Sequence, residues 1–139
     1  MPAPEMTLVE KGPFQKPPVL KGAPQSVSSE LQRWPGMVSA THWTIGDSTL
    51  VNGADFYVGE RELGHIHLDG EVHLLLSAPL AKAVLKADLA DAFPWGRDWV
   101  QLEITDKKSA ERALWLFEIG YDRLNGVSEA DLLERIRIS

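Results

Sequence analysis

The sequence contains no cysteine among its 139 residues. This absence excludes disulfides, thiolate metal sites and cysteine nucleophiles, and it fits a reducing compartment. An excess of positive charge is also missing, because 14 Lys and Arg stand against 20 Asp and Glu, for a net charge of −6. We therefore expect neither nucleic acid nor an anionic membrane as a partner, since both attract a positive field.

Long hydrophobic runs are absent as well. No apolar stretch approaches the roughly 18 residues of a membrane span, and the first residues show no signal-peptide pattern, so we expect a cytoplasmic protein. No glycine-rich loop precedes a helix where it could cradle a phosphate. The rest of the composition, 44% hydrophobic and 24% charged, is typical of one globular domain.

Proline is unevenly distributed, with six of the nine prolines in the first 25 residues. Proline fixes φ and removes a backbone hydrogen-bond donor, which disfavours regular structure in this stretch. We predict an extended, Pro-rich arm over residues 1–25 and a single domain over residues 26–139.

The hydrophobic periodicity predicts an α+β fold: an antiparallel sheet of four to six strands, packed on one side by two longer helices. The strands are expected over 37–45, 50–58, 62–68, 71–76 and 99–104, with a turn-type dipeptide, Asn52-Gly53, interrupting the second. Helices are expected from a cap at Ser26, Ser28 or Ser29 to Trp34, from Pro79 towards Phe93, from Asp106 to Leu124, and after Ser128. We expect Ser77, Ser109 and Ser128 to act at helix N-termini rather than in chemistry.

Two histidines two residues apart, His65 and His67, form the strongest local feature. Strict strand alternation places both on one face, together with Leu63, about 7 Å apart. A metal ion can sit between two imidazoles at this spacing. Further ligands would come from nearby polar residues: Glu71, His73, His42 or Glu62.

The Asp69-Gly70 dipeptide predicts a hairpin whose register decides the role of His73,. A two-residue loop places His73 opposite Ile66 and turns its side chain away from the other histidines. A three-residue loop places His73 opposite His67. Without a metal, His65 and His67 would be hydrogen-bonded strand residues that line a groove.

The segment from Trp95 to Trp99 is a second candidate site. Arg97 could bind a carboxylate or phosphate through two hydrogen bonds, and the flanking indoles could stack on a planar ligand. The structural alternative is that Arg97 pairs with Asp98 or Glu62 and that the tryptophans belong to the core.

Two family patterns share the histidine motif. Gly59, His65-x-His67 and Glu71 are spaced as in most of the first cupin metal motif, but Ala78 stands where its glycine should follow and no second motif is present. The other pattern consists of Trp34-Pro35-Gly36 with Val38, Val58-Gly59, Arg61-Glu62-Leu63-Gly64-His65-Ile66-His67, Asp69-Gly70, Trp99-Val100 and a helix that ends near Tyr121.

With this second pattern, residues 30–124 resemble the luciferase-domain family, small domains of unknown function from bacteria and fungi. The resemblance implies a compact α+β domain with a groove near Glu62, His65 and His67. Members usually carry a Pro-His-His-like segment before the tryptophan strand, whereas residues 92–97 of this chain contain no histidine. The family label by itself does not imply light emission.

Three hypotheses follow, and the sequence does not decide whether the chain is an enzyme. In the first, the histidine hairpin binds an unknown small molecule or partner, and His65, His67 and Glu62 are the catalytic candidates. The binding residues would then be Arg61, Glu62, His65, His67, Trp95 and Arg97. In the second, a divalent metal supports oxygen or hydrolytic chemistry, held by His65, His67, Glu71 and His73. In the third, the chain is an interaction module in which the arm or the last helix pairs two copies into a homodimer.

Overall fold

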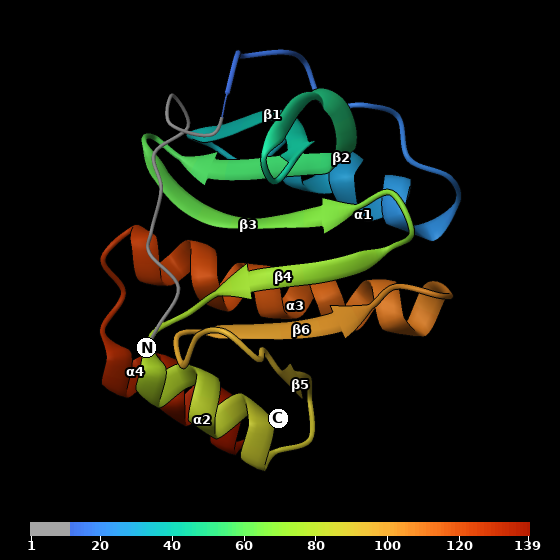
Figure 1. Ribbon diagram of the computed structural model, residues 1–139. Coiled ribbons are helices and arrows are strands. Elements are labelled where there is room, and N and C mark those ends of the chain that lie inside the picture. The colour runs from blue at the N-terminus through green and yellow to red at the C-terminus, as the bar shows by residue number, and fades with distance from the viewer. Residues whose placement is uncertain (1–11) are drawn as a thin grey trace.

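The computed structural model describes residues 12–139, which form a six-stranded antiparallel sheet and four helices (Figure 1). The strands are β1 (Met37–Thr44), β2 (Asp47–Val58), β3 (Arg61–His67), β4 (Glu71–Leu75), β5 (Asp91–Ala92) and β6 (Trp99–Glu103). The helices are α1 (Ala23–Leu31), α2 (Ala78–Lys86), α3 (Lys107–Leu124) and α4 (Glu129–Arg137). The α+β prediction is confirmed.

The strands lie in the order β1-β2-β3-β4-β6-β5. Helices α1 and α3 pack together, and α3 also packs on β3 and β4. Alternate residues of the central strands, such as Phe56, Ile66 and Leu74, enter one hydrophobic core with Leu116 and Phe117 of α3. Helices α2 and α4 pack on each other and extend this core beside β6. The intervening strand residues therefore face away from the helices.

Helix N-termini lie where the sequence signals place them. The side chains of Ser77 and Ser128 accept hydrogen bonds from the backbone N–H groups of Leu80 and Asp131. Ser109 forms a reciprocal capping box with Asp106. These serines satisfy backbone donors that a helix leaves without partners, so their role is structural, as expected.

Three local predictions are wrong. The dipeptide Asn52-Gly53 lies inside the continuous strand β2, which begins at the expected turn, Gly46-Asp47, where Gly46 has a φ of 80°. Helix α2 ends at Lys86, because Asp88 adopts a φ of 58° and residues 91–92 pair with β6. Helix α1 begins at Ala23 with Pro24 in its first turn, where proline loses no helical hydrogen bond, so residues 23–25 are helical,.

The described part of the arm runs beside the edge strand β1. The Thr41 backbone N–H donates to the Gln15 carbonyl, and the Thr41 hydroxyl donates to the Lys16 carbonyl, both at 2.7 Å. Residues 12–22 contain no helix or strand. The remainder of the predicted arm, residues 1–11, lies outside the described residues, and the division into arm and domain stays a prediction.

Candidate functional site

All four histidines of the chain gather on the sheet face opposite α1 and α3. In the strand register, Asp55 of β2 lies opposite His65 of β3, and His65 lies opposite His73 of β4. Two residues before Asp55 on β2, Gly53 lies opposite both His42 of β1 and His67 of β3. Pairing of strands from distant parts of the sequence therefore assembles the cluster.

The register of the β3–β4 hairpin determines which residue lies opposite His73. Three residues, 68–70, connect β3 to β4, and the Gly70 N–H donates to the His67 carbonyl at 2.9 Å. The two-residue alternative is wrong, and so is the pairing of His73 with His67, since His73 lies opposite His65. His73 nevertheless joins the other histidines, because residues directly opposite each other point to the same face.

A β-bulge changes the predicted alternation of β3. Gly64 pairs with Phe56 and Glu62 pairs with Tyr57, so Leu63 has no partner of its own. Leu63 belongs to the core beneath the helices; its expected position on the histidine face is wrong. The extra residue reverses the side-chain parity beyond it. As a result, the Glu62 carboxylate lies on the histidine face, with Oε1 3.5 Å from His65 Nδ1.

A chain of hydrogen bonds crosses the cluster. His73 Nε2 lies 2.6 Å from Glu71 Oε1, and His73 Nδ1 lies 3.0 Å from His65 Nε2. A carboxylate only accepts, so His73 donates from Nε2 to Glu71; a neutral His73 then accepts at Nδ1 from His65 Nε2–H. On its other side, His65 Nδ1 faces two buried carboxylates, those of Glu62 and Asp55. The hydrogen bonds therefore run from the half-exposed Glu71 to the buried His65.

The ring of His42 lies beside a buried carboxylate, Asp55, which was not among the residues predicted from the sequence. Its Nδ1 lies 2.8 Å from Oδ1 of Asp55, whose side chain is completely buried. A lone pair is repelled by a carboxylate at this distance, so the proton lies on Nδ1, and in the neutral ring Nε2 is the nitrogen that has a lone pair. The sequence signal for Asp55 is an acidic residue inside the apolar strand segment 54–58. A carboxylate buried there requires compensating partners.

His67 lies at the open end of the cluster and contacts an amide. Its Nδ1 is 3.2 Å from the Asn52 side-chain amide, and its Nε2 is buried with no hydrogen-bond partner among the described residues. Burial lowers the pKa of His67 from 6.5 to about 4, and the positive charges that His73 and His42 can carry lower it as well. The imidazole of His67 is therefore neutral at pH 7.

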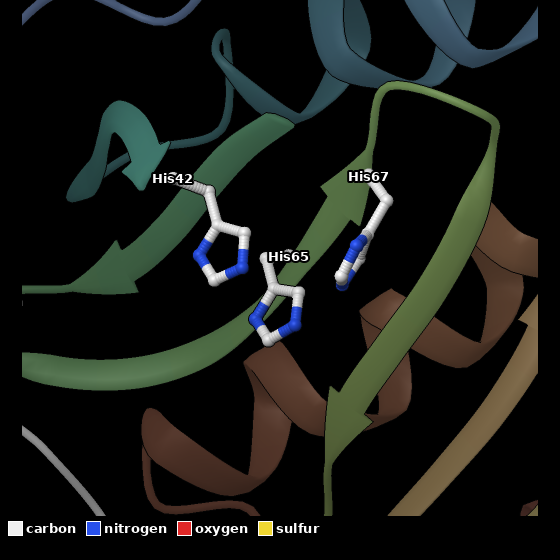
Figure 2. Close-up of side chains that lie close together, drawn as sticks. All are labelled: His42, His65 and His67. Carbon is white, nitrogen blue, oxygen red and sulfur yellow. The ribbon is translucent and has the colours of Figure 1, made fainter. Parts of the chain in front are cut away.

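Three of the histidines could hold a metal ion. His42, His65 and His67 each offer one ring nitrogen, and these nitrogens all lie within 4.8 Å of one another. Figure 2 shows their three rings side by side. The rings of His42 and His65 are stacked at 4.0 Å, so they must rotate before both nitrogens can ligate one ion. A second group, Asp55, Glu62 and His65, meets the same distance limit.

This arrangement differs from the predicted ligand set of His65, His67, Glu71 and His73. His65 and His67 belong to the three-histidine group, but Glu71 and His73 form a hydrogen bond with each other. His42, named only as a further candidate, takes their place. The difference arises because the pairing of β1 with β2, which brings His42 close, leaves no mark in the local sequence around His65.

The other predicted binding residues lie around the cluster. Phe93 packs against His73 at 4.8 Å between ring centroids, and Trp95, which is 68% exposed, packs against Phe93. Trp99 is buried beneath them and lies 6.0 Å from His65.

Two arginines complete the predicted set. Arg61 and Arg97 are exposed. Within residues 12–139 neither makes an ion pair, so the proposed pairing of Arg97 with Asp98 or Glu62 is wrong. Arg97 is thus available to a ligand, although nothing in the geometry directs it to the histidines.

Fold and site together define a small α+β domain with a histidine-carboxylate cluster on the strand face that the helices leave uncovered. Residues 60–120 match the model of a known family, the Luciferase domain. The expected resemblance to that family is therefore confirmed, over a shorter segment than the predicted residues 30–124. A search of curated proteins and a search of solved structures found no match.

The matched segment divides the cluster. It includes Glu62, His65, His67, Glu71 and His73, whereas His42 and Asp55 lie outside it, on β1 and β2.

Among the described residues, no helix is both long enough and apolar enough to cross a bilayer.

Proposed function

We propose that this domain binds a divalent first-row transition metal through His42, His65 and His67. The observation that carries the proposal is the approach of these three ring nitrogens to within 4.8 Å of one another. Neutral imidazole suits zinc, copper, nickel and iron, whereas magnesium and calcium prefer oxygen ligands. The ligands come from two strands of one sheet, which fixes their backbone positions, so only ring rotation is needed to bring the nitrogens onto one ion.

The surrounding groups support metal binding. Asp55 can accept a hydrogen bond from His42 Nδ1–H and fix the tautomer that leaves Nε2 to the metal, the arrangement typical of zinc-bound histidines,. The Asn52 amide nitrogen lies 3.2 Å from His67 Nδ1; when the amide is flipped, its oxygen accepts from Nδ1–H and orients the ring of His67 in the same way. The low pKa of His67 keeps its lone pair available at neutral pH.

The number of ligands favours a catalytic over a purely structural metal site. Three histidines leave a tetrahedral ion one open position for water or a substrate atom. A water bound there loses a proton more readily, which supports hydrolysis, and a redox-active metal could instead bind oxygen. The exposed ring of Trp95 and the ring of Phe93 lie on the side of His73 and could contact a planar substrate.

A second candidate function needs no metal. The chain Glu71–His73–His65 connects the surface with a buried histidine through contacts of 2.6 and 3.0 Å. In this alternative, a small molecule binds at the cluster and the histidines transfer its protons. Nitrogen-15 NMR tests the chain directly, because it requires protons on Nε2 of both His73 and His65.

Metal titration separates the two functions. Protein purified without a histidine tag and treated with chelator is titrated with Zn²⁺ by calorimetry and with Co²⁺ by visible absorption. We expect one ion per chain, a four- or five-coordinate Co²⁺ spectrum, and at least about tenfold weaker binding in His42→Ala and His67→Ala. Asp91→Asn, an exposed position on β5, is the control and should keep the affinity. Absence of saturable binding, or equal binding by His42→Ala, would rule out this metal site.

A further inference from the structure

A second concave surface lies on the helical side of the molecule, away from the histidines. It is a groove of about 730 Å³ between α1 and α3, continued by Trp34 and Pro35 after α1. Figure 1 shows α1 and α3 on the same side of the sheet. The α3 part of the lining recurs every three or four residues, from Glu111 to Asp122, and is therefore one stripe of that helix,.

Aromatic rings form the walls of this groove. Trp34, Trp115 and Tyr121 all line it, and all three are only partly buried. The rings of Trp34 and Tyr121 meet edge to face at 5.0 Å. The Tyr121 hydroxyl donates to the Pro35 carbonyl, which ties α3 to the chain that follows α1. The rings are thus fixed by packing, while part of their surface remains accessible to a ligand.

The charge of the lining has one sign. Four carboxylates, those of Glu30, Glu111, Glu118 and Asp122, line the groove, and no lysine or arginine does. Glu30 and Asp122 have arginine partners outside the groove, Arg33 and Arg135.

The other two carboxylates, Glu111 and Glu118, are exposed and form no ion pair with any residue from 12 to 139. The groove therefore combines aromatic walls with two carboxylates that form no ion pair, and Arg135 attracts Glu118 from outside the groove.

We propose that this groove binds a small organic ammonium cation with an apolar body. The faces of Trp and Tyr rings attract a cation, by roughly 0.5–2 kcal/mol for each favourable contact. The carboxylates add Coulomb attraction, and the ring surfaces contact the alkyl groups. Anions are repelled by the same carboxylates. A bare metal ion gains no ligand atom from the indole rings.

The test compares a cation with its uncharged isostere. Choline and 3,3-dimethyl-1-butanol have nearly the same shape, but only choline carries a charge. Binding is followed by calorimetry and by the indole N–H signals in NMR. We expect choline to shift the signals of Trp34 and Trp115, and to bind at least about tenfold more tightly than the alcohol.

Variants assign the binding to the groove. Replacing both free carboxylates, Glu111→Gln with Glu118→Gln, should weaken choline binding about threefold to tenfold. Trp115→Leu should weaken it to a similar degree, with folding checked by circular dichroism. The matched control is Glu103→Gln on the exposed end of β6, which should change nothing.

Two outcomes would overturn the proposal. One is equal affinity for choline and the neutral alcohol, which would make the groove a purely apolar site. The other is a dimer in light scattering that the double glutamine variant dissociates, which would make a second copy of the chain the occupant. Neither outcome affects the metal proposal, because the histidines lie on the opposite face of the sheet.

Discussion

The rings of His42 and His67 lie 5.1 Å apart although their strands, β1 and β3, are not neighbours. The strand between them presents Gly53 at this point, opposite both histidines. A glycine places no side chain between the rings, and it also lets β2 approach β3 closely. A Cβ at position 53 would lie 2.0 Å from the Ile66 carbonyl oxygen. The glycine is therefore part of the histidine site.

Replacing this glycine should damage both fold and site. Gly53 has a φ of 155° and meets rigid backbone, so we expect Gly53→Ala to lower the free energy of unfolding by more than about 3 kcal/mol. Urea denaturation measures the effect. Gly59→Ala is the matched control: its φ of 62° is also unfavourable, but nothing surrounds it within 4 Å, and a loss of only about 1–2 kcal/mol is expected. Equal losses would contradict the close approach.

Protonation of His67 should destabilise the metal-free protein in acid. Burial lowers the folded-state pKa to about 4, against 6.5 for an ordinary histidine. Between these values the unfolded chain binds the proton more readily, so the stability contributed by His67 falls as the pH drops from 6.5 towards 4. Urea denaturation across this range, compared with His67→Gln, isolates the contribution. An NMR titration that gives His67 a pKa near 6.5 would contradict the prediction.

Removing the charge beneath His42 tests the supporting role of Asp55. Asn has the size of Asp, but at the same contact it lacks the charge that fixes His42 Nδ1 as a donor. We expect Asp55→Asn to weaken Zn²⁺ binding about 10- to 100-fold, measured by competition with a chromophoric chelator. Asp91→Asn, an exposed position on β5, is the control and should bind normally. Unchanged affinity in Asp55→Asn would separate this carboxylate from the metal site.

The contact between the β3 bulge and α3 should decide whether Gly120→Ala raises or lowers the free energy of unfolding. Within a helix, glycine to alanine ordinarily stabilises by about 1 kcal/mol. At Gly120, however, a Cβ would lie 2.8 Å from Leu63 Cδ1 and 3.3 Å from the Leu75 carbonyl oxygen. Leu63 can move but the strand backbone cannot, so we expect Gly120→Ala to destabilise by about 1–3 kcal/mol. A raised melting temperature would show that the helix shifts without strain.

Local patterns determined the features that depend on near neighbours in the chain. Strand alternation places His65 and His67 on one face, and the capping signals at Ser77, Asp106 and Ser128 lie at the starts of helices. These features rest on hydrogen bonds and side-chain periods within a few residues, which the sequence encodes directly.

Tertiary structure decided the path of β2, the bulge in β3 and the partners of His65 and His67. The dipeptide Asn52-Gly53 locally favours a turn, and the pairing of β2 with β1 and β3 on either side overrides that preference and keeps it in a strand,. The bulge at Leu63 brings Glu62 to the histidines, and strand register adds His42, Asp55 and His73. Side chains that are distant in sequence meet only when the strands pair. The sequence alone therefore indicates two of the histidines as a site, and the folded sheet supplies their partners.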